Sequence, residues 1–424
     1  MLAASLGLVT GRIVAAEAPV QRFQFGAGPA TDGARLVSAG DRYTSQRGCG
    51  FEPGLEVKNV PGGVMGSPAC YFTTDLSEGN WRVTVTLRGA PGGGGAAVKA
   101  ELRRLMLGPV RLAEGEVLAR SFIVNVRTPR IAARNGVAAG GVDLKAPRET
   151  TQEAWGWDDR LTLEINGAVL AAVEITPASV PTVFLLGDST VCDQMGEPYG
   201  SWGQMLPRFF RPTVAIANHG ESGETYRDSI ARRRLDKIIS VLQPGGWVLM
   251  QFGHNDQKQI AAGTGGPFTT YQEEMKTHIA AVRRGGGIPV IVSPMERRRF
   301  DAAGQVVPTL ADYARAAREV AAAEGVAFID LNAMSKRFYA ALGPDASAQA
   351  FAAPGGKVDN THHNNYGSYE LAKCIVQGVR DARLGIAAHI ADDFPGFDPA
   401  HPDDPKTFAM PASPNFTNQR PLGD

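Results

Sequence analysis

A serine stands at the end of a short apolar run, where a nucleophile would be useful. Residues 183–186 are Val-Phe-Leu-Leu, and Gly187, Asp188 and Ser189 follow directly. An apolar run of this length before a glycine is typical of a buried parallel strand that ends in a loop. Ligands of open α/β sheets bind outside the carboxyl ends of such strands. Ser189 is therefore a candidate nucleophile, although Gly-Asp-Ser is also common in ordinary turns.

A serine nucleophile needs a base that takes its proton and a carboxylate that orients the base. The best pair downstream is Asp359 and His362, in the loop before the last predicted helix. At this spacing in a turn, an acid and a histidine can both face inward and contact each other. Because Ser189 follows the first predicted strand and this pair follows the last, both fall on the carboxyl edge of the sheet. The alternative is a turn acid and a helix-capping histidine.

Ester hydrolysis also needs hydrogen-bond donors that face the developing oxyanion. Asn255 follows the third predicted strand, in the sequence Gly-His-Asn-Asp, and offers a carboxamide N–H. Gly223 follows the second, in Glu-Ser-Gly-Glu-Thr, and allows the close approach of a backbone N–H. Loops are polar in any case, but the coincidence of four such loops on one sheet edge favours an active site.

Four further residues are candidates for substrate contacts at the rim. Arg297 and Arg298 follow the fourth predicted strand; they could bind a carboxylated sugar or belong to a solvated run of arginines. Tyr199 could line a polysaccharide groove. His254 is adjacent to Asn255, although a histidine in such a place is more often a hydrogen-bonded structural group. No Cys or His cluster has the spacing of a structural zinc site.

The second half of the chain alternates between apolar runs and amphipathic stretches. The predicted strands are 183–186, 214–217, 247–252, 289–292 and 326–330. The predicted helices are 201–211, 227–242, one around 271–282, 309–323 and 365–380. Strands that alternate with helices predict an α/β fold with a doubly wound, three-layer parallel sheet.

The first half of the chain has the pattern of an all-β sandwich. Residues 81–88 alternate between apolar and polar side chains, and 121–126 do so less cleanly. Residues 161–170 predict a hairpin, because Asn166-Gly167 suits a type I′ turn. Helical periodicity is scarce apart from a short segment at 102–107. A β-sandwich of this kind is either a carbohydrate-binding module or a structural platform, and residues 175–181 resemble a linker.

Composition excludes some classes of partner. Lys+Arg and Asp+Glu both number 43, and this zero net charge argues against nucleic acid or an anionic membrane surface. No apolar run approaches the roughly 20 residues of a membrane span. Residues 1–18 end in Ala-x-Ala and resemble a short signal peptide without its basic region, so we expect a secreted or periplasmic protein. Cys49 and Cys70 could then form a disulfide.

The four loops resemble, in order, the sequence blocks of the SGNH (GDSL-type) hydrolases. The serine block starts at Gly187, with Thr190 where lipolytic members have Leu, and residues 218–225 resemble the glycine block. Residues 253–256 resemble the asparagine block, and the Asp-x-x-His block continues as Asp-x-x-His-x-Asn-x-x-Gly to Gly367. The residues of these blocks are most similar to those of rhamnogalacturonan acetylesterases. The resemblance covers about residues 181–385.

This resemblance implies a flavodoxin-like α/β/α fold and the removal of O-acetyl groups from pectic or similar polysaccharides, with no metal or organic cofactor. It implies Ser189 as nucleophile, His362 as base and Asp359 as its orienter. The oxyanion hole would consist of the Ser189 and Gly223 backbone N–H groups and the Asn255 side chain. One departure is Glu-Thr at 224–225, where fungal members often have Arg-Ser, which leaves the substrate contacts beside the hole open.

The expected organisation is a signal peptide (1–18), a β-sandwich that resembles galactose-binding-like modules (20–176), an SGNH hydrolase domain (181–390) and an irregular tail (391–424). The resemblance implies that the partner is an acetylated plant cell-wall polysaccharide or oligosaccharide, rhamnogalacturonan or pectin first, and we expect neither nucleic acid nor a membrane as a partner. The alternatives are an esterase for another glycan such as xylan or for a small or lipid ester, and a non-catalytic carbohydrate-binding protein.

Overall fold

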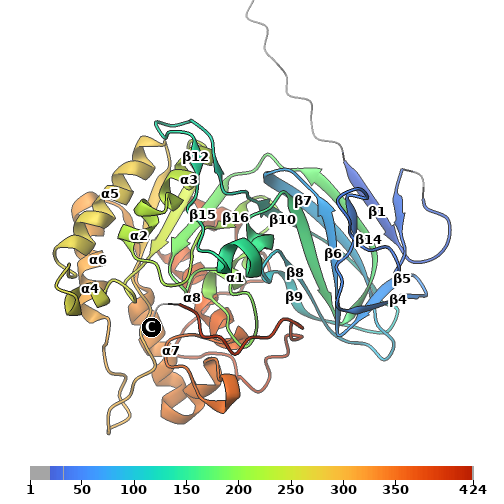
Figure 1. Cartoon of the computed structure of the whole chain (residues 1–424). Helices are drawn as coiled ribbons and strands as arrows, with labels where there is room; N and C mark the ends of the chain where they lie inside the picture. Colours follow the sequence, from blue (N-terminus) through green and yellow to red (C-terminus); the bar gives the residue numbers. More distant parts are fainter. Residues whose placement is uncertain (1–19, 32, 423–424) are drawn as a thin grey trace, which may run out of the picture.

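The computed structural model describes residues 20–31 and 33–422, which form a β-rich part and an α/β part side by side (Figure 1). The predicted signal peptide, residues 1–18, lies outside the described residues. Among the helices described, none is both long and apolar enough to cross a bilayer.

The β-rich part is a sandwich of two sheets around one apolar core. The first sheet contains Gln21–Phe25 (β1), Arg35–Val37 (β2), Glu56–Val60 (β4), Gly63–Ser67 (β5), Gly79–Gly89 (β7), Val117–Val126 (β10) and Ala168–Pro177 (β14). The second contains Cys49–Phe51 (β3), Ala69–Asp75 (β6), Gly94–Ala100 (β8), Arg104–Leu112 (β9) and Arg160–Asn166 (β13). Alternate side chains of β7, such as Val83 and Val85, lie in the same buried core as Leu161 and Leu163 of β13, as the alternation predicts.

The predicted hairpin at Asn166-Gly167 is wrong. β13 pairs with β6 and β8, whereas β14 pairs with β7, β1 and β5, so this turn carries the chain from one sheet to the other. The positive φ angle that Asn-Gly predicts for a tight turn is present, since Gly167 has a φ of 68°. Both strands find partners along their whole length elsewhere, and each buries one face in the shared core.

The helical segment predicted at 102–107 is also wrong. Glu101 and Arg103 have positive φ angles, 56° and 61°, and form a turn with the residue between them. Strand β9 then begins at Arg104 and pairs with β8. The apolar side chains of this stretch therefore belong to a turn and a strand, which the short pattern could not distinguish from a helix.

The α/β part contains a parallel sheet of order β16-β15-β17-β18-β19. Its strands are Thr182–Gly187 (β15), Ala215–Asn218 (β16), Trp247–Gln251 (β17), Ile288–Val292 (β18) and Ala327–Ile329 (β19). Each predicted strand is confirmed to within one residue at either end. The first strand lies between the second and the third, which is the flavodoxin-like order. The carboxyl ends of β15, β16 and β17 are consequently neighbours.

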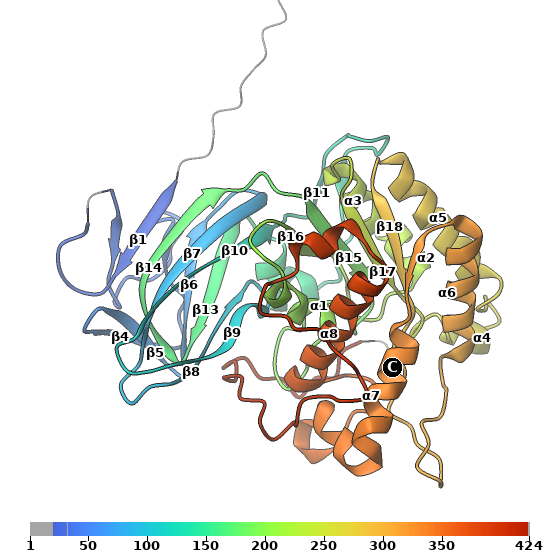
Figure 2. The same ribbon diagram turned by 180° about the vertical axis from the view of Figure 1, so that it is seen from behind.

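Helices cover both faces of this sheet, so the predicted three-layer α/β/α fold is confirmed. Val183 and Leu185 of β15 pack on one face, and Phe184 and Leu186 pack on the other. The first face carries Trp202–Met205 (α1), Leu331–Ala346 (α7) and Asn365–Asp381 (α8), and Figure 2 shows α8 in front of the strands. The second carries Tyr226–Ala231 (α2), Arg234–Val241 (α3), Thr270–Arg284 (α5) and Ala311–Glu324 (α6), and short Lys258–Ala261 (α4) follows β17.

The structure differs from the helical predictions in three places. The helix predicted over 201–211 is the short helix α1 followed by a 3₁₀ helix, Leu206–Phe209 (η3). The helix predicted over 227–242 is broken into α2 and α3, because Arg233 takes a left-handed φ of 60°. This break turns Arg234 inward, where its guanidinium is fully buried between carboxylates. Helix α7 is an addition that periodicity does not predict, since much of its length is only half-buried.

Residues 127–157, here called the arm, leave the sandwich after β10 and lie against the α/β part (Figure 1). The arm contains Arg130–Ile131 (β11), Gly140–Gly141 (β12), Arg148–Gln152 (η1) and Ala154–Gly156 (η2). Its Asn135 donates hydrogen bonds to the carbonyls of Ile239 and Leu242, at 2.8 and 3.0 Å. The irregular tail after residue 390 also joins the two parts, since Ser413 donates to Glu164 of β13 at 2.7 Å.

The disulfide considered between Cys49 and Cys70 is absent, and both residues are buried free thiols. The register places Cys49 opposite Thr74, four residues further along β6 than Cys70. Four residues of strand span about 13 Å, whereas the Cα atoms of a disulfide lie within about 7 Å.

Candidate active site

Three side chains that are distant in the sequence form a hydrogen-bonded chain at the carboxyl edge of the parallel sheet. Ser189 Oγ lies 3.0 Å from Nε2 of His362, and Nδ1 of the same ring lies 2.9 Å from Oδ2 of Asp359. All three residues are buried. A carboxylate only accepts hydrogen bonds, so Nδ1 carries the proton and Nε2 accepts from the serine hydroxyl. This is the geometry of a nucleophile, a base and an orienting acid.

Ser189 stands in a tight turn that Asp188 shapes. β15 ends at Gly187, and the Asp188 carboxylate accepts from the N–H and the hydroxyl of Thr190, at 2.9 and 2.7 Å. Its other oxygen lies 3.2 Å from Nδ1 of His254. Burial would raise the pKa of Asp188, but His254 and Thr190 hold it below its ordinary value. Both oxygens of Asp188 thus have partners in Thr190 and His254, and Asp188 does not contact His362.

The loop that carries Asp359 and His362 is held from two sides. Oδ1 of Asp359 accepts from the backbone N–H groups of Thr361 and His362, at 2.8 and 3.0 Å. Arg298 donates its backbone N–H and its Nη1 to the carbonyl and side-chain oxygens of Asn360, at 2.8 and 3.0 Å. The carboxylate therefore presents a fixed oxygen, Oδ2, to the histidine.

Arg420 of the tail is a site residue that the sequence does not predict. Its Nε lies 2.6 Å from Oδ2 of Asp359, and its Nη2 lies 3.2 Å from Oδ1. Burial alone would raise the pKa of Asp359, but hydrogen bonds from His362 and Arg420 hold it well below its usual range. The acid consequently stays ionised at any working pH. An arginine 61 residues away in an irregular tail carries no signal that could have revealed this contact.

Two of the three predicted oxyanion donors, Gly223 and Asn255, come from the loops after β16 and β17. Gly223 has a φ of 76°, in the left-handed region that glycine favours. Nδ2 of Asn255 donates to the carbonyl of Glu224 at 3.1 Å. Because an amide has two N–H groups, the second remains to face a substrate oxygen. Nζ of Lys258 approaches Oδ1 of Asn255 at 3.4 Å and thereby favours this orientation of the amide.

Each of the four residues predicted at the rim contacts other residues of the protein. Tyr199 is buried, with its ring at 88° to that of His362 and 6.0 Å between the centroids. His254 contacts Asp188, as described above. Arg297 donates to Gln257 at 2.7 Å and to the carbonyl of His254 at 3.3 Å. Substrate contact by Tyr199, His254, Arg297 or Arg298 stays a prediction.

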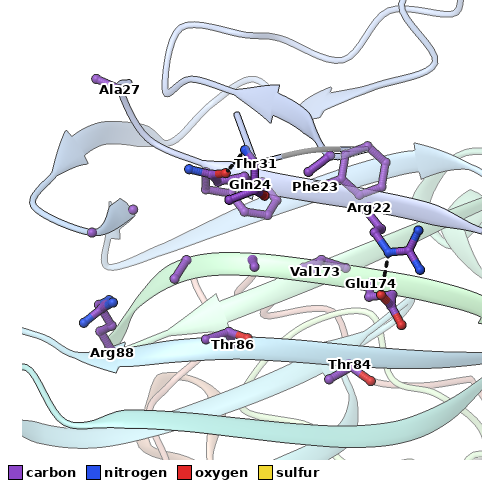
Figure 3. A pocket seen from close by; sticks show the side chains of 16 residues that line it. Arg22, Phe23, Gln24, Ala27, Thr31, Thr84, Thr86, Arg88, Val173 and Glu174 are labelled. Atoms are coloured by element: carbon purple, nitrogen blue, oxygen red, sulfur yellow. Dashed lines mark hydrogen bonds and ion pairs between the residues drawn. The ribbon is translucent and has the colours of Figure 1, made fainter. Parts of the chain in front are cut away.

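The sandwich contains a separate cavity of about 560 Å³, shown in Figure 3. Its lining residues all come from the β-rich part, and Arg22 and Glu174 form an ion pair of 2.7 Å at its wall. It shares no residue with the Ser189 site. Carbohydrate binding by the sandwich, and its likeness to galactose-binding modules, stay predictions.

Comparisons with known proteins identify a family and several similar proteins. A model of the GDSL-like lipase/acylhydrolase family matches residues 185–368. The rhamnogalacturonan acetylesterase RhgT of Bacillus subtilis is 35% identical over 219 residues, which are 49% of this chain and 93% of RhgT. The protein YesY of the same organism, a probable rhamnogalacturonan acetylesterase, is 30% identical over 49% of this chain and 96% of its own length. The solved structure of B. subtilis YxiM covers 87% of this chain and 99% of its own, with 22% identity and a TM-score of 0.47.

The matched region includes the serine, glycine, asparagine and Asp-x-x-His loops, all of which lie on one edge of the parallel sheet. The prediction from the four sequence blocks is confirmed, and the chain belongs to the GDSL-like lipase/acylhydrolase family, the SGNH hydrolases.

Proposed function

We propose that the protein is a carbohydrate O-acetylesterase that uses Ser189, His362 and Asp359 to remove acetyl groups from a plant cell-wall polysaccharide of the rhamnogalacturonan type. The observation that carries this proposal is the hydrogen-bonded chain from Ser189 Oγ through His362 to Asp359. The names of the relatives RhgT and YesY support the acetyl group and the glycan.

The proposed mechanism is acyl transfer in two steps. Nε2 of His362 takes the proton of Ser189 as Oγ attacks the acetyl carbonyl carbon, and the oxyanion accepts hydrogen bonds from the Ser189 and Gly223 N–H groups and Asn255 Nδ2. The sugar oxygen leaves with the proton from His362, which gives the acetyl-enzyme. Water then loses a proton to His362 and attacks the acetyl carbonyl, and acetate is released as Oγ of Ser189 leaves and takes that proton back from His362. Asp359 stabilises the imidazolium in both steps.

The glycan is tested by a panel of substrates. Initial rates of acetate release are measured on acetylated rhamnogalacturonan I, acetylated xylan and aryl esters of increasing chain length. We expect kcat/KM to be highest on rhamnogalacturonan. A higher value on xylan or on long-chain aryl esters would replace the proposed substrate with the corresponding alternative.

The non-catalytic alternative is tested with a fluorophosphonate probe, which labels an activated serine. Ser189 should be labelled, and removal of the base in His362→Ala should abolish the labelling. A folded wild-type protein that neither reacts with the probe nor releases acetate would favour a carbohydrate-binding protein on a hydrolase scaffold.

Substitution of Asn255 by alanine should lower kcat by about 10²–10³-fold, the usual cost of one lost oxyanion donor. The fold should persist, because the described contacts of the side chain are limited to the Glu224 carbonyl and Lys258. Turnover of 4-nitrophenyl acetate and the melting temperature measure the two effects. A kcat within a few-fold of wild type would remove Asn255 from the proposed hole.

A further inference from the structure

The arm makes direct contacts with the loop that carries Gly223. Nζ of Lys145 donates to the carbonyl of Ser222, and Nη2 of Arg148 donates to the hydroxyl of the same serine at 2.9 Å. Nε of Arg148 also lies 3.3 Å from the carboxylate of Glu221. Two cations of the arm thus hold two consecutive residues on the amino side of Gly223.

The carboxyl side of Gly223 is held through the buried Glu224. Its carboxylate lies 2.6 Å from Nε of Arg234 at the start of α3 and 3.4 Å from Nζ of Lys145. Nη2 of Arg234 in turn lies 2.5 Å from the carboxylate of Glu149 in the arm. The arm, the loop after β16 and helix α3 therefore share one buried ion-pair network.

The contacts of Ser222 and Glu224, on either side of Gly223, affect the position of the oxyanion donors. Gly223 has no side chain, so the direction of its N–H depends on how Ser222 and Glu224 are held. The carbonyl of Glu224 also accepts from Nδ2 of Asn255, and it thereby sets the orientation of the amide. Movement of this one loop would displace two of the three proposed donors.

We propose that Lys145, Arg148, Glu149 and Glu153 of the arm are positioning residues that hold the Gly223 loop, and through it Asn255, in the geometry of the oxyanion hole. The inference rests on the proposed function of the Ser189 site. It makes the arm part of the catalytic unit although it contributes no reacting atom. It also accounts for Glu-Thr at 224–225: Glu224 accepts the buried cations, and Thr225 forms the capping box of α2 with Asp228.

The network contains the carboxylates of Glu149, Glu153, Glu221 and Glu224 and the cations Lys145, Arg148, Arg234 and, 3.9 Å from Glu224, Arg232. Carboxylate oxygens of Glu149, Glu153 and Glu221 lie within 4.8 Å of one another. Burial, and then repulsion by Glu221, raises the pKa of Glu153 to about 9. Glu153 is hence neutral at pH 7, with Arg148 Nε 2.6 Å away. The charged and titratable groups around it are Arg148, Glu149, Glu221, Glu224, Cys192, Lys145 and Arg234.

The first test replaces Arg148 by methionine, which keeps the length of the side chain and removes the charge. We expect kcat on 4-nitrophenyl acetate to fall by roughly 10–100-fold, with KM within twofold, because small misplacement of catalytic groups has effects of this size. Arg148→Lys should recover part of the loss. The matched control is Asn135→Ala, which removes another contact between the arm and α3 but none to the loop, and it should leave kcat unchanged.

The second test replaces Glu153 by glutamine, which mimics the neutral acid and can keep the contact with Arg148. Above about pH 9, Glu153 of the wild type ionises beside Glu221, and the repulsion should displace the loop. The wild-type kcat should therefore fall at alkaline pH, and Glu153→Gln should retain a larger share of its pH 7 rate at that pH. This comparison decides the question even if Arg148→Met does not fold.

The outcomes are separable. A folded Arg148→Met enzyme with wild-type kcat, equal losses in Arg148→Met and Asn135→Ala, or identical alkaline profiles for wild type and Glu153→Gln would each overturn the positioning role. A wild type that hydrolyses no acetyl ester would instead overturn the proposed function.

Discussion

Substitution of Ser189 by alanine is expected to reduce acetate release by about 10⁴-fold or more, as loss of the nucleophile does in other serine hydrolases. Its Oγ is 3.0 Å from the base, and the neighbouring turn offers no second hydroxyl in that position, because the Thr190 hydroxyl donates to Asp188. The rate is measured as acetate release from acetylated rhamnogalacturonan I, with the melting temperature as a check of folding.

The melting temperature should change little, because the hydrogen bond to His362 is the polar contact that the Ser189 side chain makes within the described residues. A matched control is Ser121→Ala in β10, which removes a hydroxyl 2.7 Å from that of Thr84 in the sandwich. This control should release acetate at the wild-type rate. If Ser189→Ala kept more than a few per cent of the activity, the acyl-enzyme mechanism would be wrong.

Substitution of Asp359 by asparagine is expected to lower kcat by about 10⁴-fold. Oδ1 of Asp359 accepts two backbone N–H groups, so the carbonyl oxygen of the new amide must take that place. Its NH₂ group then faces Nδ1 of His362. That nitrogen must become the acceptor, which puts the proton on Nε2 and leaves no site for the serine proton.

The comparison variant is Arg420→Met, which leaves the contact between Asp359 and His362 in place. It should lose much less activity than Asp359→Asn, since the histidine keeps its tautomer. Steady-state rates of both variants on 4-nitrophenyl acetate, with circular dichroism as a check of folding, make the comparison. An Asp359→Asn enzyme as active as Arg420→Met would argue against the orienting role of the acid.

The sequence predicts the α/β part well because its determinants are local. Each buried parallel strand is a continuous apolar run, and each loop at its carboxyl end follows within a few residues. The order of the runs, with polar residues after each, is therefore enough to bring Ser189, Gly223, Asn255 and His362 to one edge. The same locality misleads at Asn166-Gly167, where the turn is predicted correctly but its partners are not. The partners of β13 and β14 are strands that are distant in the sequence, and a local turn signal does not specify them.

The sequence by itself thus determined the sheet, the family and the residues with which the chemistry can be done, since apolar periodicity and short loops encode them. The tertiary structure alone decided that Arg420 contacts Asp359 and that Lys145 and Arg148 hold the Gly223 loop. Ion pairs between distant segments depend on how separate parts of the chain pack, and charged residues in irregular stretches have no periodicity. What surrounds the triad is therefore specified by packing, whereas the triad itself is specified by the order of residues along the chain.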